Sequence, residues 1–236
     1  EENVVVADGV SVYGSGVPIV GPDGKTYPAA TPPTVVGDGE TATFTMGDNT
    51  TLAGFNIQSS PSAEGTDLIP SPNNHGIWDA SRAGIKAVNK TGLTIYGNTF
   101  SNVSYGAIIV NNNDLPDPKD NVVADIYDNE FNFADANGLV IDVEGPEAAP
   151  FVPGDLIPGN FQVNLVNNDY SYNGNYGLFV DARRFENASL LIDGGNAMAN
   201  GNAGVGITVC ENTGIADVQI AGEQFTANGN ATSGIS

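Results

Sequence analysis

The amino-acid sequence predicts an all-β protein, folded as a right-handed parallel β-helix (a solenoid) of about five to seven coils with long loops rich in proline and glycine. Three observations predict this fold class. Similar segments recur along the chain, each repeat holds short alternating strands, and the turns carry the same residue types from one repeat to the next. Equivalent turns in successive repeats are typical of stacked parallel coils rather than of antiparallel hairpins.

The composition favours strands over helices. The chain has Gly 30 and only 15% charged residues, beside many Asn, Thr, Val and Ile. Strands joined by tight turns need such residues, whereas helices favour Ala, Leu, Glu and Lys. With 40% hydrophobic residues the chain can bury one sizeable core. We therefore expect a single β-helix domain over residues 1–236.

The clearest repeats predict regular coils over residues 92–236. They recur at intervals of about 30 residues, and each holds a strand, a polar corner, an apolar residue and a second strand. The copies span residues 92–110, 123–143, 162–182, 189–209 and 216–236. We align their equivalent apolar residue at Phe100, Phe131, Tyr170, Ala197 and Phe225.

The rest of the chain repeats less regularly. We assign residues 1–58 to N-terminal coils and a capping loop, because Pro and Gly dominate between Val17 and Pro33, where the chain is expected to cross the open end of the stack. Residues 59–91 are predicted to be rich in loops. A proline-rich insert between Gly145 and Gly159 is expected to bulge from one corner, since proline cannot occupy a central strand.

Two rows of equivalent residues are expected to run along the stack. The first strands supply an inward apolar row: Ile95, Ile126, Leu165, Ile192 and Ile220. The polar corners supply an asparagine row: Asn98, Asn129 and Asn168. Because neighbouring strands lie about 4.8 Å apart, these side-chain amides can hydrogen-bond to one another, and we predict that they stabilise the fold rather than bind a ligand.

The charge balance excludes several kinds of partner. Lys+Arg 7 against Asp+Glu 28 gives a net charge of -21. Such a field repels nucleic acid and anionic membrane surfaces, whereas it tolerates cations such as Ca²⁺. No apolar stretch is long enough for a transmembrane helix, so we expect no membrane insertion of this segment. Because the chain starts at Glu1 without a signal peptide, we expect it to be part of a longer secreted protein.

Two acidic residues are predicted to meet on the outer face of one sheet. When the repeats are aligned on the glycines that precede the second strands, Ile109, Ile141 and Val180 are expected to point into the core. The residues that follow them, Val110, Asp142 and Asp181, are then expected to be neighbours on the outer face of the sheet. Carboxylates so placed repel each other unless a cation bridges them, and Glu144, Arg183 and Arg184 are near in sequence. The competing interpretation is that these are ordinary solvated acids balanced by two arginines.

The only histidine and the only tryptophan lie close together, in the segment SPNNHGIWD. His75 and Trp78 could form a sugar-binding pair, with the indole ring stacked on a pyranose. A loop residue that caps the core is the interpretation we favour for Trp78, because aromatic side chains are mostly buried.

Short motifs in the coils resemble those of known β-helix families. GNTFSN at residues 97–102 and DGVSVYG at residues 8–14 resemble β-helix domains of bacterial surface proteins. The motifs FTAN, YSYN, AMAN and GAI, which begin at Phe225, Tyr170, Ala197 and Gly106, resemble the FxxN and GGAI repeats of autotransporter-type passenger domains. The coils as a whole are similar to those of the pectate-lyase-like superfamily.

The resemblance implies two alternative functions. The passenger-domain likeness implies a non-catalytic stalk or adhesin of a bacterial cell-surface protein, displayed at the outer membrane, with a host surface protein or polysaccharide as partner and no cofactor. The lyase likeness implies a secreted lyase or epimerase of acidic polysaccharides, in which Asp142, Asp181 and Glu144 hold Ca²⁺ and Arg183 or Arg184 acts as base. The Asn-Thr-Asp, Asp-Asp and Gly-His-Gly motifs of polygalacturonases are missing. We favour the non-catalytic function.

Overall fold

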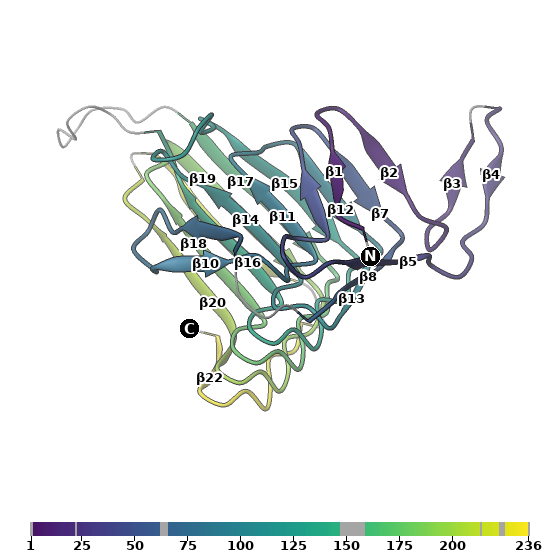
Figure 1. The fold of residues 1–236 in the computed structure, drawn as a ribbon. Helices are drawn as coiled ribbons and strands as arrows, with labels where there is room; N and C mark the ends of the chain where they lie inside the picture. The colour runs from purple at the N-terminus through teal and green to yellow at the C-terminus, as the bar shows by residue number, and fades with distance from the viewer. Residues whose placement is uncertain are drawn as a thin grey trace.

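A computed structural model of the chain describes residues 2–21, 23–61, 66–146, 159–212, 214–221 and 225–235. These residues form strands, turns and loops without a helix, which confirms the prediction of an all-β protein. Accordingly, the described part of the chain contains no helix that could cross a membrane. The strands form long parallel sheets (Figure 1), an arrangement that fits a parallel β-helix.

Three parallel sheets build the body of the protein. Sheet 1 contains, in spatial order, β1 (Val4–Val6), β6 (Phe44–Met46), β11 (Ile85–Val88), β14 (Ala107–Asn111), β16 (Leu139–Glu144), β18 (Leu178–Arg183), β20 (Ala203–Cys210) and β22 (Ser233–Ile235). Sheet 2 contains β2 (Ser11–Tyr13), β7 (Thr51–Ala53), β12 (Leu93–Tyr96), β15 (Val122–Tyr127), β17 (Asn160–Val166), β19 (Asn187–Asp193) and β21 (Ala216–Ala221). Sheet 3 contains β5 (Thr34–Gly37), β8 (Asn56–Ser59) and β13 (Thr99–Ser101).

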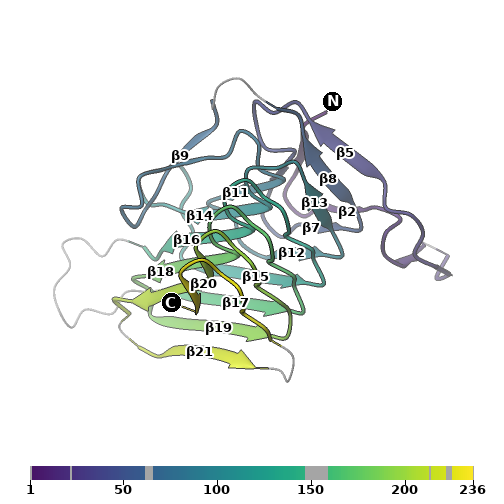
Figure 2. The ribbon, with the colours of Figure 1, turned by 90° about the horizontal axis from the view of Figure 1, so that it is seen from below.

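The chain visits the sheets in a fixed order, from sheet 1 to sheet 2 to sheet 3 and back to sheet 1. Single parallel bridges continue sheet 3 beyond β13, from Thr99 to Glu130, Asp169, Asn196 and Thr226 in turn. Figure 2 shows sheet 2 as successive strands from β7 to β21, each one coil further along the stack. Every coil therefore rests on the equivalent coil before it.

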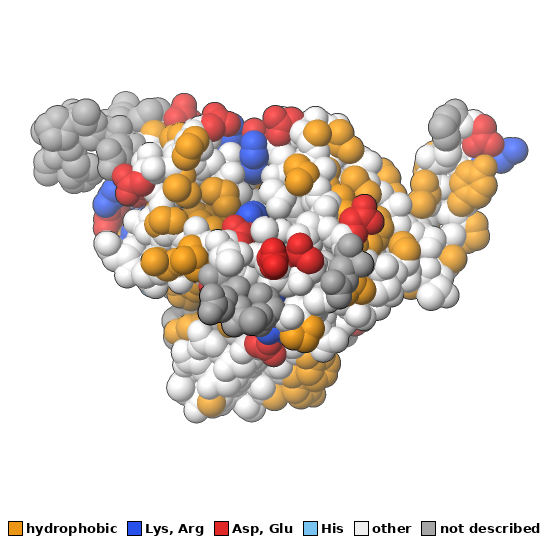
Figure 3. Space-filling model, in the orientation of Figure 1, with side chains coloured by type: hydrophobic (Ala, Val, Ile, Leu, Met, Phe, Trp, Pro, Cys, Tyr) orange, Lys and Arg blue, Asp and Glu red, His pale blue; other side chains and the backbone are white. Residues whose placement is uncertain are grey.

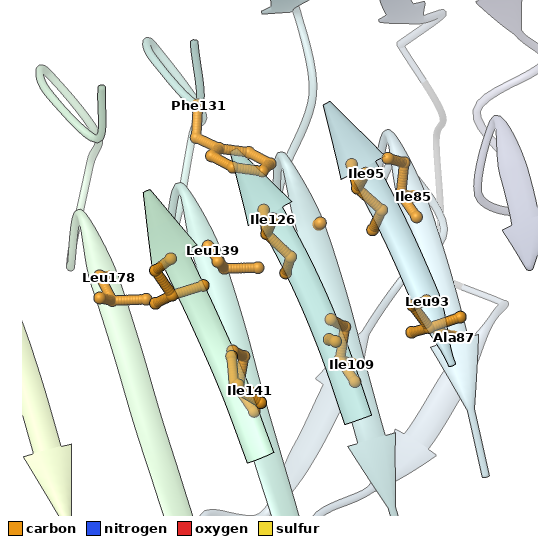
Figure 4. Close-up of a cluster of buried hydrophobic side chains, with 14 of the residues drawn as sticks. Ile85, Ala87, Leu93, Ile95, Ile109, Ile126, Phe131, Leu139, Ile141 and Leu178 are labelled. Atoms are coloured by element: carbon orange, nitrogen blue, oxygen red, sulfur yellow. The ribbon is translucent and has the colours of Figure 1, made fainter. Parts of the chain in front are cut away.

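The inward apolar row of sheet 2 has the predicted register. Ile95, Ile126, Leu165, Ile192 and Ile220 pair in that order from strand to strand. Ile109, Ile141 and Val180 pair in the same way in sheet 1, as predicted. Figure 4 shows side chains of both rows meeting between the sheets. Apart from Ile220 in β21, which is 41% exposed, these rows belong to one continuous buried core.

The aromatic row of sheet 3 differs from the prediction at its last member. Phe100, Phe131 and Tyr170 stack with ring centroids 4.9 and 5.7 Å apart, and Ala197 follows Tyr170 in register. Thr226 pairs with Asn196, so Ala227 rather than Phe225 continues the row. The alignment of Phe225 was therefore wrong, because the motif FTAN is offset by two residues from YSYN and AMAN. A motif match cannot override the hydrogen-bonded register.

The asparagine ladder is confirmed at the corner between sheets 2 and 3. The buried side-chain Nδ2 of Asn98 donates to Oδ1 of Asn129 over 3.1 Å, and Asn129 donates likewise to Asn168 over 3.0 Å. Gly195 takes the next position, where a side-chain Cβ would collide with the carbonyl oxygen of Asn168. A second ladder, which the sequence alignment missed, joins Asn200 to Asn230 over 3.0 Å at the following corner.

Two antiparallel hairpins lie outside the coils, in segments predicted to be loops. The hairpin of β9 (Leu68–Pro70) and β10 (Ile77–Asp79) belongs to the loop-rich segment 59–91, which also contains β11. The hairpin of β3 (Ile19–Val20) and β4 (Thr26–Tyr27) stands away from the stack in Figure 1. Val17, at the start of this segment, lies beside Gly54 and Gly97 of the second and third coils. Most of the insert after Gly145, residues 147–158, lies outside the described residues.

The register predicts opposite effects for two positions of β17. Leu165 is buried, whereas Gln162 in the same strand points to solvent. Leu165→Asp buries an unpaired carboxylate, so we expect the free energy of unfolding to fall by more than about 4 kcal/mol. Gln162→Asp serves as the control and should change it by less than about 0.5 kcal/mol. Urea unfolding measures both, and equal stabilities would show that the register is wrong.

Candidate functional site

The predicted acidic pair lies on the outer face of sheet 1. Val110, Asp142 and Asp181 pair in that order on β14, β16 and β18, as the alignment predicted. Both acidic residues are nevertheless fully buried, with residue exposures of 0%. They are not solvated surface acids, because the hairpin of β9 and β10 covers them.

A short turn between β9 and β10 shapes the part of the hairpin that reaches the acids. The hydroxyl of Ser71 accepts hydrogen bonds from the backbone N–H groups of Asn73 and His75, and the Ser71 N–H bonds to the carbonyl of Gly76. Asn74 and Gly76 adopt positive φ angles of 65° and 88°, which suit Asn and Gly. The turn thereby holds Ser71, Asn73 and His75 on the side that faces sheet 1.

Three donors from the hairpin saturate Asp142. The Ser71 hydroxyl and the Trp78 Nε1 both donate to Oδ2 of Asp142 over 2.6 Å. The Asn73 Nδ2 donates to Oδ1 over 2.8 Å. Burial raises the pKa of Asp142 above its ordinary value, and these hydrogen bonds oppose that rise by stabilising the carboxylate. Asp142 therefore anchors the hairpin to the sheet.

Asp181 is bonded to the two basic groups nearest to it. His75 Nε2 lies 2.6 Å from Oδ2 of Asp181. Arg183 donates from Nε to Oδ1 and from its terminal nitrogen to Oδ2, both over 2.8 Å. This bidentate contact raises the pKa of Arg183. A guanidinium held in that way is a poor general base, since it must give up a proton that its partner stabilises.

Glu144, two residues after Asp142 in β16, forms a separate set of contacts. Its Oε1 accepts a hydrogen bond from the backbone N–H of Asn113 over 3.0 Å. Its Oε2 lies 3.3 Å from Arg184, whose Nε also bonds to Glu211 over 3.1 Å. The three predicted metal ligands are thus each engaged by donors of the protein. In the described part of the chain, no group of three or more His, Cys, Asp or Glu side chains is arranged to hold a metal ion.

The rings of His75 and Trp78 take part in packing. Trp78 meets Tyr105 edge-on with centroids 6.1 Å apart, and His75 meets Phe179 edge-on with centroids 5.0 Å apart. Trp78 also packs against a small apolar cluster between the hairpin and sheet 1, which includes Ile69 and Val140. The structure therefore brings the predicted ligand pair and the predicted acids together, as a covered polar cluster.

Sequence reasoning missed Ser71 and Asn73, two of the five side chains that contact the carboxylates of the acid pair. Both lie in the segment Ser71–His75, where Ser, Pro and Asn are common loop residues without a distinctive spacing. The only available signal was the nearby His75 and Trp78. Figure 3 shows the face that carries the hairpin, with acidic side chains scattered beside a few basic ones and hydrophobic side chains gathered near β10 and β18.

Removing the anchor tests whether the acid holds the hairpin. Asp142→Ala leaves the hydroxyl of Ser71 and the indole N–H of Trp78 without their acceptor and removes one of the acceptors of Asn73. We therefore expect a loss of about 3 kcal/mol in the free energy of unfolding. Asp217→Ala, at an exposed position of β21, is the control and should cost less than about 0.5 kcal/mol. Denaturant unfolding followed by Trp78 fluorescence measures both variants. An Asp142 variant as stable as the control would contradict the anchoring role.

Comparison with known proteins assigns no family to this chain. No protein-family model matches it, and neither the curated proteins nor the solved structures give a match.

Proposed function

We propose that this chain is a non-catalytic segment of a right-handed parallel β-helix, displayed outside the cell as the passenger, stalk or adhesin part of a bacterial outer-membrane surface protein. One observation carries the proposal: the acids and bases best placed for catalysis bond to one another and to the hairpin of β9 and β10. The right-handed sense follows from the strong preference of connections between parallel strands.

The stacking of equivalent strands supports a role as a rod or spacer. Each strand of sheet 2 from β7 to β19 has a parallel neighbour on both sides. Coils stacked in this way build the elongated body of solenoid proteins.

The charge supports a place outside the cell and restricts the partners. A net charge of -21 with only seven basic residues keeps an elongated domain soluble and repels anionic polymers. The partners we propose are a host surface protein or a polysaccharide.

The alternative is a secreted lyase or epimerase of acidic polysaccharides. It is favoured by the cluster of His75 and Arg183 on Asp181, since the two basic side chains remain 32% and 25% exposed. Ca²⁺, however, takes six to eight oxygen ligands. The carboxylates of Asp142 and Asp181 are instead occupied by N–H and O–H donors. Because the described residues contain no cluster of three or more acidic, His or Cys side chains placed for a metal ion, they do not suit calcium, and we retain the non-catalytic function.

A lyase assay separates the two functions. The purified chain, incubated with pectate, alginate and other polyuronates with and without Ca²⁺, should produce no increase in the absorbance of unsaturated products over a protein-free blank. Neither Ca²⁺ nor a chelator should move the midpoint of thermal unfolding, because the acid pair is already satisfied. Turnover of any polyuronate that is lost in Arg183→Ala would overturn the proposal in favour of the enzyme.

A further inference from the structure

Two aromatic side chains are exposed side by side where the chain turns from sheet 3 back to sheet 1. Phe133 and Tyr172 occupy the same position of neighbouring coils and are 63% and 51% exposed. Their rings stack with centroids 5.2 Å apart and an interplanar angle of 5°. Unlike the stacked rings of Phe131 and Tyr170 in the core, this pair faces solvent.

The backbone at this corner makes the two aromatic residues unusual. Phe133 and Tyr172 have φ angles of 59° and 62°, in the left-handed region that bulky residues rarely adopt. The bridges of sheet 3 identify the equivalent residues of the other coils as Asn102, Ala199 and Gly229, with φ angles of 56°, 55° and 69°. The fold therefore forms the same corner with small side chains. Large rings in a costly backbone conformation, with no structural need for them, indicate a functional role.

The neighbours of the pair leave its outer ring faces open along the stack. Asn102, on the side of Phe133, and Ala199, on the side of Tyr172, are both exposed and short. Polar groups flank the Phe133 end, because Arg82 donates to Asp135 over 2.8 Å and to the carbonyl of Asn102 over 3.2 Å. The corner thus combines a flat apolar platform with one exposed carboxylate and one guanidinium.

We propose that the pair formed by Phe133 and Tyr172 is a binding site for sugar rings of an uncharged polysaccharide. The apolar C–H face of a pyranose can stack on an open aromatic face, while its hydroxyls can donate to Asp135 and accept from Arg82. The net charge of -21 disfavours uronate and sulfated glycans. The inference goes beyond the proposed rod and rests on it only for the extracellular setting in which such polymers occur.

Affinity electrophoresis of the purified chain tests the site. Native gels that contain xylan, galactomannan or a soluble β-glucan should retard the wild-type protein with at least one of these polymers, and gels that contain alginate should not. The double variant Phe133→Asn and Tyr172→Asn carries the residue that Asn102 supplies in the preceding coil. It should weaken binding at least about tenfold, as the loss of an aromatic anchor does. Its thermal midpoint should stay within about 5 °C of the wild type, because the corner tolerates Asn.

The control and a second variant keep the result interpretable. Tyr27→Asn removes an equally exposed aromatic ring from β4, away from the corner, and should bind as the wild type does. If the Asn variant unfolds, Phe133→Ala with Tyr172→Ala takes its place, because the equivalent corner of a later coil already carries Ala199.

Absence of retardation by every neutral polymer, or unchanged retardation of the double variants, would overturn the proposal. The proposal would also be overturned if sedimentation showed a dimer for the wild type and for Tyr27→Asn but a monomer for the double variants. The rings would then bind a second copy of the chain. Lyase activity, which would refute the proposed function, leaves this outcome unaffected.

Discussion

The parallel register of the coils is the constraint on which the rest of the structure depends. Each residue lies beside its equivalent in the next coil, about 4.8 Å away, so equivalent side chains of successive coils contact one another. Apolar residues then form the continuous rows of the core, and asparagines form ladders such as Asn98 to Asn129. The same rule stacks Phe133 on Tyr172 at an exposed corner. Self-matching rows thus determine both the stability of the stack and the surface that it presents.

The register also creates a conflict, which the hairpin of β9 and β10 resolves. Placing Asp142 beside Asp181 on one sheet puts two carboxylates at one strand spacing, an arrangement that is unfavourable unless opposite charge or donors offset it. Donors from Ser71, Asn73 and Trp78 satisfy one acid, and His75 with Arg183 satisfies the other. The predicted acid pair thus attaches a non-repeating segment to the repeating body.

The sequence predicted those parts of the structure in which repeats constrain one another. The row of Leu165 and the pairing of Asp142 with Asp181 followed from aligning glycines and strands, because a parallel stack admits one register at a time. The covering of the acids could not be predicted, since Ser71 and Asn73 lie in a loop that no repeat constrains. Phe225 was misplaced because a short motif was followed where hydrogen bonding sets a different offset. The sequence did not predict that Phe133 and Tyr172 form an exposed stacked pair, because neither their positive φ angles nor their exposure can be read from the residue types.

A distance across two coils tests the parallel register most directly. Gln162 and Asp217 face outward in β17 and β21, and both are paired with Ser189 in the strand between them. Spin labels on Gln162→Cys and Asp217→Cys, in a Cys210→Ser background, should show strong dipolar broadening, because two strand spacings separate the backbones by about 10 Å. Labels that show no dipolar broadening would contradict the stacked parallel coils.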